Sequence, residues 1–326
     1  MDVKADARAS WITGRSFSMA RIPITKTPKV YVGGQFIRSE SGRVFPVREA
    51  GRGKGEAGGG KREGGSGRGE AALLGNIPQC TRKDLRNAVE AAAKAGPDWA
   101  RRTPYNRGQI LYRLGEMLES RSAEMADALV ISGASTKAAA AKEVLASVDR
   151  LIYYAGWSDK YEQVLGNTNP VAGPFFNFTV AEPMGIIGII ADDAFPLLGL
   201  LSQIAPVIIA GNTCVCLASQ EFPYPAIVLG ELLAVSDLPG GVVNLLTGFR
   251  KELVPTFATH THIRGVNAVV SQEEKKQLQL GAAESIKRVR ARKRDDDLDW
   301  TGEKAQSVYE IRDFIEFKTT WHPIGA

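Results

Sequence analysis

The chain has 326 residues, of which 44% are hydrophobic, and a formal net charge of +5. This length suits one large domain or two modest ones, since a domain usually takes roughly 100 to 200 residues. No apolar run reaches the roughly 20 residues of a membrane-spanning helix. The three cysteines, Cys80, Cys214 and Cys216, are too few for a disulfide framework. We expect a soluble protein of a reducing, cytoplasmic compartment.

The amino terminus is predicted to be a flexible lead. The stretch MDVKADARASWITGRSFSMAR has no apolar signal core, and Asp2 and Asp6 are atypical of a transit peptide. The predicted division of the chain is a lead (1–28), a hairpin with helices (29–174), a nucleotide-fold part with an oligomerisation strand (175–294), and a linker with a carboxy-terminal oligomerisation strand (295–326).

Residues 51–69, GRGKGEAGGGKREGGSGRG, are predicted to be a disordered loop. They carry almost no apolar side chain to offset the entropy cost of ordering. GKGEAG matches the dinucleotide pattern GxGxxG, and GEAGGGKR approaches the phosphate-loop pattern with Arg62 at the hydroxyl position. Such cradles need an entering strand and a leaving helix, and neither flanks this segment, so we predict no phosphate binding here. A translated intron remains an open alternative for this insert.

Strands and then helices are predicted before residue 175. KVYVGGQFI turns at its Gly-Gly pair, and RVFPV is predicted to pair with LLGNIP across the insert. Thr81 and Asp84 form a capping-box pattern ahead of an amphipathic helix. Two further helical runs are predicted at about 105–130 and 135–161.

From Phe175 onward strands and helices alternate. FFNFTVAEPMGIIGIIA is rich in strand formers, and its later part is apolar on both faces, as is typical of a strand covered by helices. A helix at about 196–210, the strand NTCVCLA, the helix PAIVLGELLAVS and the strand GVVNLLTG follow, with HIRGVNAVV and SIKRVRAR as further strand candidates. This alternation predicts an α/β fold with a doubly wound parallel sheet, preceded by helices.

Several segments in this order resemble the aldehyde dehydrogenase superfamily: YYAGWSDKY, EPMGIIGII, FPLL, IAPVIIAGNT and LPGGVVNLLTG, within roughly residues 30–292. The tail FIEFKTTWHPIGA is similar to the family's carboxy-terminal oligomerisation strand. The pattern is most similar to the degenerate second module of aldehyde dehydrogenase family 16. The resemblance implies a Rossmann-like sheet. It also implies a chemistry in which a Cys thiolate attacks an aldehyde, hydride passes to NAD(P) and a Glu activates water.

The residues at the positions of that chemistry do not suit it. The family loop PWNFP corresponds to DDAFP, so Ala194 replaces the oxyanion-holding Asn and Asp193 replaces the Trp. Arg292 replaces the Glu base, and an arginine stays protonated. None of the cysteines lies in a GQxC setting, and the stretch between RARKRDDD and the tail is too short for a catalytic domain. We therefore expect the catalytic domain to be missing.

The cofactor positions are also altered. Leu217 and Gln220 stand where the family's KPSE has the Lys and Glu that hold the adenosine ribose. Val270 and Ser271 stand where a Gly-Ser turn approaches the pyrophosphate. Leu has no hydrogen-bonding group, and the branched side chain of Val opposes close backbone approach. We expect no bound cofactor, or at most a vestigial NAD(P) site.

Three small motifs favour ordinary structural roles. His260 and His262 form an HxH pair, but no Cys or carboxylate cluster stands at ligand spacing, so we predict no metal site. NFT at 177–179 is a formal glycosylation sequon, interpreted as chance because no secretory signal accompanies it. Cys214 and Cys216 point to one face of a buried strand and are predicted to be small core residues.

Two charged motifs have competing interpretations. The basic run IKRVRARKR (286–294) is of a kind that binds nucleic acid, but acidic residues follow at 295–297 and stacking aromatics are lacking. Pairing with an acidic neighbour is the better interpretation. Asp192 and Asp193 point to opposite faces of an extended chain, so we predict a solvated loop tip rather than a metal or acid/base pair.

Two hypotheses of function follow. The first is a noncatalytic aldehyde dehydrogenase-like module that scaffolds or regulates a catalytic aldehyde dehydrogenase module, in cis or in trans. It is expected to form homo-oligomers through strand addition by FFNFTV and FIEFKTTW, with no nucleic-acid or membrane partner. The alternative is an NAD(P)-dependent aldehyde dehydrogenase that is active only in a longer chain or a complex. Whether the sequence is a piece of a longer polypeptide stays open.

Overall fold

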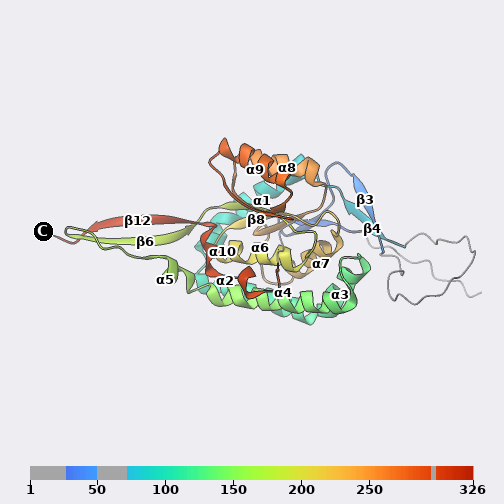
Figure 1. Cartoon of the computed structure of the whole chain (residues 1–326), viewed down its shortest axis with the longest axis horizontal. Coiled ribbons are helices and arrows are strands. Elements are labelled where there is room, and N and C mark those ends of the chain that lie inside the picture. The colour runs from blue at the N-terminus through green and yellow to red at the C-terminus, as the bar shows by residue number, and fades with distance from the viewer. Residues whose placement is uncertain (1–26, 50–71, 295–298, 326) are drawn as a thin grey trace, which may run out of the picture.

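A seven-stranded sheet lies at the centre of the protein (Figure 1). The computed structural model describes residues 27–49, 72–294 and 299–325. The strand order is β11 (Arg288–Lys293), β10 (Ile263–Val270), β7 (Ile186–Ile190), β8 (Thr213–Leu217), β9 (Val243–Leu246), β1 (Val30–Val32) and β2 (Gln35–Ile37). The strands from β11 to β9 run parallel, as predicted. The other end is different, because β1 pairs antiparallel with both β9 and β2, and the sheet is therefore mixed.

Helices cover both faces of this sheet, which confirms the doubly wound arrangement (Figure 1). One face packs against α1 (Arg82–Arg101), α8 (Arg250–Thr259) and α9 (Gln272–Ala283). On the other face, α6 (Leu198–Ile209) and α7 (Tyr224–Leu233) contact the sheet. An outer layer of α2 (Pro104–Ser120), α3 (Ser122–Ile131) and α4 (Lys137–Trp157) packs on these two helices. Alternation along β8 serves both cores: Cys214 and Cys216 face one, and Val215 and Leu217 face the other.

A three-stranded ribbon projects from the body beside the short helix α5 (Tyr161–Leu165) (Figure 1). It consists of β12 (Ile315–Pro323), β6 (Phe175–Pro183) and β5 (Asn167–Thr168), in that order. β12 and β6 pair antiparallel over their whole lengths. The stretch predicted as one β-rich segment thus divides after Pro183, and its two halves enter different sheets.

Two hairpins near the amino terminus are as predicted. β1 and β2 turn at Gly33 and Gly34, whose φ angles of +62° and +82° suit glycine. β3 (Val44–Arg48) pairs antiparallel with β4 (Leu73–Pro78). The predicted loop 51–69 lies outside the described residues, as does the predicted lead, apart from residues 27 and 28.

The helices differ from the prediction in two respects. The run predicted at 105–130 is two helices, because Arg121, with φ −110° and ψ 23°, interrupts it. In addition, α8 and α9 were not predicted from the sequence. Only two residues of α9, Leu278 and Ala282, are buried, so its apolar stripe is weak. The capping box at Thr81 is confirmed.

Two features are absent from the described residues. No helix in this part of the chain has the length and apolar character to cross a membrane. No group of three or more His, Cys, Asp or Glu side chains with metal-binding geometry occurs there either.

Candidate functional site at the carboxyl ends of the parallel strands

The loop after β7 carries two aspartates that are buried, so the predicted solvated loop tip is wrong. Asp192 is 3% exposed and Asp193 is 6% exposed. The two side chains do point in different directions, as expected for adjacent residues. Asp192 accepts a hydrogen bond from the indole N–H of Trp300 at 2.9 Å, and Asp193 accepts one from the Ser219 hydroxyl at 2.7 Å. Each carboxylate has a protein partner, which is what makes its burial possible.

Asp193 is the centre of a buried ionic cluster. Its carboxylate lies 3.2 Å from Nη2 of Arg250 and 3.5 Å from Nη2 of Arg294, and it accepts the backbone N–H of Gln220 at 2.9 Å. Burial raises the pKa of Asp193, but Arg250 and the Ser219 hydroxyl outweigh it, so the pKa lies below its ordinary value. The carboxylate is therefore ionised and fully used by its own chain.

Arg250 joins this cluster to the sheet. Its guanidinium donates to the carbonyl of Val269 at 2.8 Å and to the carbonyl of Ala191, so it links the ends of β10 and β7. Arg294 lies 3.6 Å from Glu274 and extends the cluster to α9. The roles of Arg250 and Glu274 were not predicted from the sequence, because these residues meet Asp193 and Arg294 only when distant strand ends come together in the fold.

The amino terminus of α9 is capped by its own side chains. The Ser271 side chain accepts the N–H of Glu274 at 3.2 Å, and the Glu274 carboxylate accepts the N–H of Ser271 at 2.8 Å. A helix amino terminus normally attracts phosphate through its free N–H groups and its dipole. Here a carboxylate already holds that place and repels a second anion.

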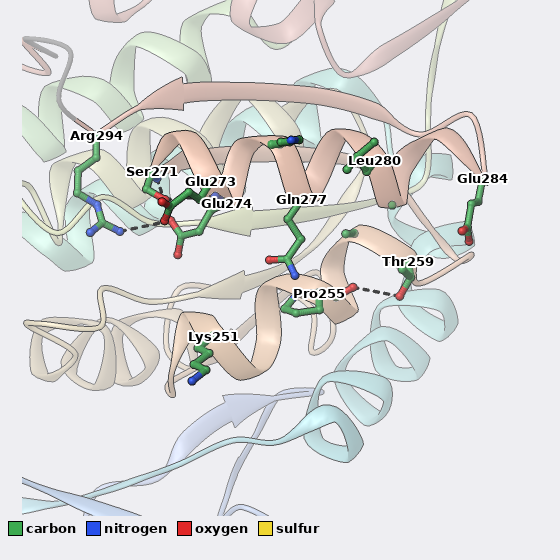
Figure 2. A pocket seen from close by; sticks show the side chains of 13 residues that line it. Lys251, Pro255, Thr259, Ser271, Glu273, Glu274, Gln277, Leu280, Glu284 and Arg294 are labelled. Atoms are coloured by element: carbon green, nitrogen blue, oxygen red, sulfur yellow. Dashed lines mark hydrogen bonds and ion pairs between the residues drawn. The ribbon is translucent and has the colours of Figure 1, made fainter.

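A groove with a volume of about 840 Å³ is lined by residues of α8 and α9 (Figure 2). Lys251, Gln277, Leu280 and Arg294 are among its lining side chains. Leu217 and Val270 do not line it, since both are fully buried in the core. The Gln220 side chain accepts the N–H of Arg250 at 2.8 Å instead of facing a ligand. These residues do not fit a dinucleotide: the position aligned with the ribose-binding Lys lies in the core, and a carboxylate holds the phosphate-facing helix end.

The residue at the expected base position is a paired cation. Arg292 donates to Asn267 at 3.0 Å and to Glu310 at 2.7 Å, and its guanidinium lies 5.3 Å from the ring centre of Trp300. Ala194, at the expected amide position, is exposed and offers only its backbone N–H, which donates to Asp192 at 3.2 Å. Neither position provides a base or a side-chain oxyanion donor.

The cysteines are inert core residues. Cys80, Cys214 and Cys216 are each 0% exposed. Burial raises the pKa of Cys80 to about 12 and also raises the pKa of Cys216. The sulfurs of Cys214 and Cys216 lie 3.6 Å apart on one face of β8, which confirms their predicted orientation.

The basic run 286–294 is largely neutralised within the body. Arg290 lies 2.9 Å from Asp313, and Arg288 lies 3.3 Å from Glu316. Pairing with acidic residues is thus confirmed, but these acids come from the carboxy-terminal segment; residues 295–297 lie outside the described part of the chain. The ring centres of His260 and His262 lie 5.9 Å apart.

The chain is similar to known proteins of one family. The profile of the family described as "Aldehyde dehydrogenase family" matches residues 68–292. The chain is 33% identical over 269 residues to retinal dehydrogenase 2 of Gallus gallus, covering 81% of this chain and 48% of that protein. It is 30% identical over 246 residues to hydroxyisobutyraldehyde dehydrogenase of Mycolicibacterium austroafricanum, covering 76% and 45%.

The fold is similar to solved structures as well. The NAD+ complex of an aldehyde dehydrogenase from Bacillus cereus superposes with a TM-score of 0.72 at 24% identity, covering 82% of this chain and 51% of that one. The chain therefore spans about half the length of the relatives it matches. On the extent of the family match and the identity to these relatives, the chain belongs to the aldehyde dehydrogenase family.

Proposed function

We propose that this chain is a noncatalytic aldehyde dehydrogenase module that scaffolds or regulates a catalytic aldehyde dehydrogenase module in the cytoplasm. The observation that carries the proposal is the state of the three catalytic positions. Ala194 has no side-chain donor, Arg292 is paired with Glu310, and every cysteine of the chain is buried. Oxidation of an aldehyde through a covalent thiol adduct needs a thiolate, a base and an oxyanion donor at one point. We further propose that the chain is of the same type as the degenerate second module of aldehyde dehydrogenase family 16.

The proposal includes weak or absent NAD(P) binding. The supporting observation is the cluster of Asp193, Arg250, Arg294 and Glu274, in which both cations are paired with carboxylates. A pyrophosphate needs free donors or free positive charge. In Arg250 and Arg294 the terminal guanidinium nitrogens contact carboxylates of this chain instead.

Association is proposed to occur through the ribbon. Phe175 and Trp321 form an edge-to-face pair with ring centres 5.7 Å apart, and their side chains are 38% and 57% exposed. Phe176 and Phe317 add further exposed aromatic surface. Within the described residues β12 pairs only with β6, so its outer edge can accept another strand. The proposed occupant is a module of the same family, as a second copy or a catalytic relative.

The test is the native mass of the purified chain, alone and mixed with an active aldehyde dehydrogenase, with the relative's turnover measured in both states. We expect a homo-oligomer alone and a mixed assembly with altered turnover or stability of the relative. A monomer that neither joins the relative nor changes its properties contradicts the scaffold proposal.

A second candidate is an NAD(P)-dependent aldehyde dehydrogenase active only in a longer chain or a complex. It is favoured by the open groove between α8 and α9 and by the related structure solved as an NAD+ complex. The two proposals differ in one measurable property. Under this alternative, a complex or longer chain containing these residues loses activity when Arg292 or Ala194 is changed, while under the first proposal such changes leave turnover by the catalytic module intact.

A further inference from the structure

Trp300 lies against the loop that carries Ala194 and against Arg292, the two expected catalytic positions. It is 2% exposed and packs with Leu198 and Val269. A Cβ added to Gly199 would lie 3.4 Å from Nε1 of Trp300, so the lack of a side chain at Gly199 lets the indole approach α6 closely. The indole N–H donates to Asp192, two residues before Ala194, and Arg292 stacks on the ring.

A buried arginine holds the backbone that carries this indole. Arg150 of α4 is 3% exposed and donates to the carbonyls of Trp300 and Ala305, each at 2.7 Å, and to the side chain of Gln306 at 2.9 Å. Its guanidinium also donates to the Ser202 hydroxyl at 2.7 Å. A buried guanidinium is costly unless its donors are satisfied, and here the satisfaction comes mainly from this one segment.

The same segment is fixed again farther along. Glu310, in α10 (Val308–Arg312), forms ion pairs with Arg290 and Arg292 of β11. Phe314 is fully buried, and its carbonyl accepts from Asn212 at 2.8 Å. The anchors at Arg150, β11 and Asn212 therefore lie on different elements and restrain residues 299–314 along their length.

We infer that residues 299–314 form a closing strap, in which Trp300 plugs the space where a substrate aldehyde and a partner's thiolate would have to meet. This inference rests on the proposed noncatalytic function and deepens it. A missing cysteine supplied by another chain cannot reach the positions of Ala194 and Arg292 together while the indole lies against that loop and against Arg292.

Thiol labelling tests the strap without any measurement of catalysis. The variant Val269→Cys places a thiol directly beneath Trp300, in a protein whose native cysteines are all 0% exposed. Lys304→Cys, on the exposed side of the strap, is the matched reference for a free thiol. With a small thiol reagent under native conditions, we expect Val269→Cys to react at least ~100-fold more slowly than Lys304→Cys, since reaction requires local opening.

Adding Trp300→Ala to Val269→Cys is expected to raise the labelling rate at least ~10-fold. Trp300→Phe, which keeps a ring but loses the indole N–H, is expected to give a smaller increase and serves if the alanine variant does not fold. Reaction of Val269→Cys within about threefold of the reference, or no increase with either Trp300 variant, overturns the strap. Because no turnover is measured, that result leaves the noncatalytic proposal standing.

Discussion

The guanidinium of Arg250 lies 3.2 Å from the carboxylate of Asp193, and the side chains are only 4% and 7% exposed. Asp193 stands at the loop position where the family has a Trp. Its buried negative charge must therefore be balanced by cations of this chain. Arg250 and Arg294 provide that balance, and Glu274 balances the second cation. The cluster is thus a structural unit at the very place where the resemblance implies cofactor and substrate.

Neutralising Asp193 is expected to destabilise the fold. Asp193→Asn keeps the size of the side chain but leaves Arg250 buried without its nearest counter-charge, which costs about 3 kcal/mol of unfolding free energy. Urea denaturation measures the loss. Glu316→Gln, which breaks the exposed pair with Arg288, is the control and should cost less than about 1 kcal/mol. Equal losses in the two variants would show that the buried cluster carries no special weight.

Acid is expected to destabilise the fold through Glu310 and Asp193. For Glu310, burial raises the pKa, but Arg290 and Arg292 outweigh it and leave the pKa below its ordinary value, as for Asp193. Unfolded Asp and Glu titrate near 3.9 and 4.3, so this stabilisation is present above about pH 4 and disappears as the pH falls through the folded-state values. Glu310→Gln should be less stable at neutral pH and lose less stability on acidification. Parallel pH profiles for the two proteins would be inconsistent with this account.

Raising the pH into the alkaline range is expected to stabilise the fold through Lys287. Its ammonium donates to the carbonyls of Phe257, Ala258 and His260 at 3.0, 2.7 and 3.0 Å, and burial lowers its pKa to about 8. Between that value and the ordinary one near 10.4, the unfolded chain binds more protons than the folded chain, so stability rises with pH by at most about 1.4 kcal/mol per pH unit. Lys287→Met removes this term. From about pH 8 upward, the unfolding free energy of the wild type should therefore rise relative to that of Lys287→Met. A difference between the two proteins that stays constant with pH would contradict this role of Lys287.

Removing aromatic surface from the ribbon is expected to reduce association without unfolding. Trp321→Ala, alone or with Phe175→Ala, deletes side chains that are largely exposed in the single chain, so the melting temperature should change little. Native mass at fixed protein concentration should shift toward the monomer. Tyr309→Ala removes a comparably exposed aromatic, 58%, outside the ribbon and should leave the mass unchanged. If both ribbon variants keep the wild-type mass, the ribbon is not the site of association.

Local patterns in the sequence predicted most of the elements but not all of the architecture. Strands such as β7 and β8 are apolar on both faces, and the capping box at Thr81 marks a helix start, so these features could be identified from neighbouring residues. The antiparallel addition of β1 and β2 could not, because pairing with β9 joins residues far apart in the chain. For α9 a signal existed in Ser271 and Glu274, which form a capping box ahead of a weakly amphipathic helix.

The site shows a similar division. Position by position, the resemblance identified Ala194, Arg292, Leu217 and Val270 as altered residues. It did not indicate which contacts these altered residues and their neighbours make in the fold. The exposure of Asp192 and Asp193 was predicted wrongly, since an acidic pair in a loop usually faces water and only the fold brings Trp300 and Arg250 to these carboxylates.

Aldehyde-dependent reduction of NAD and NADP by the purified chain tests the central claim most directly. With a panel of aliphatic and aromatic aldehydes, the account predicts the same rate of cofactor reduction with and without the protein. Steady reduction that scales with protein concentration and stops when the aldehyde is omitted would contradict it.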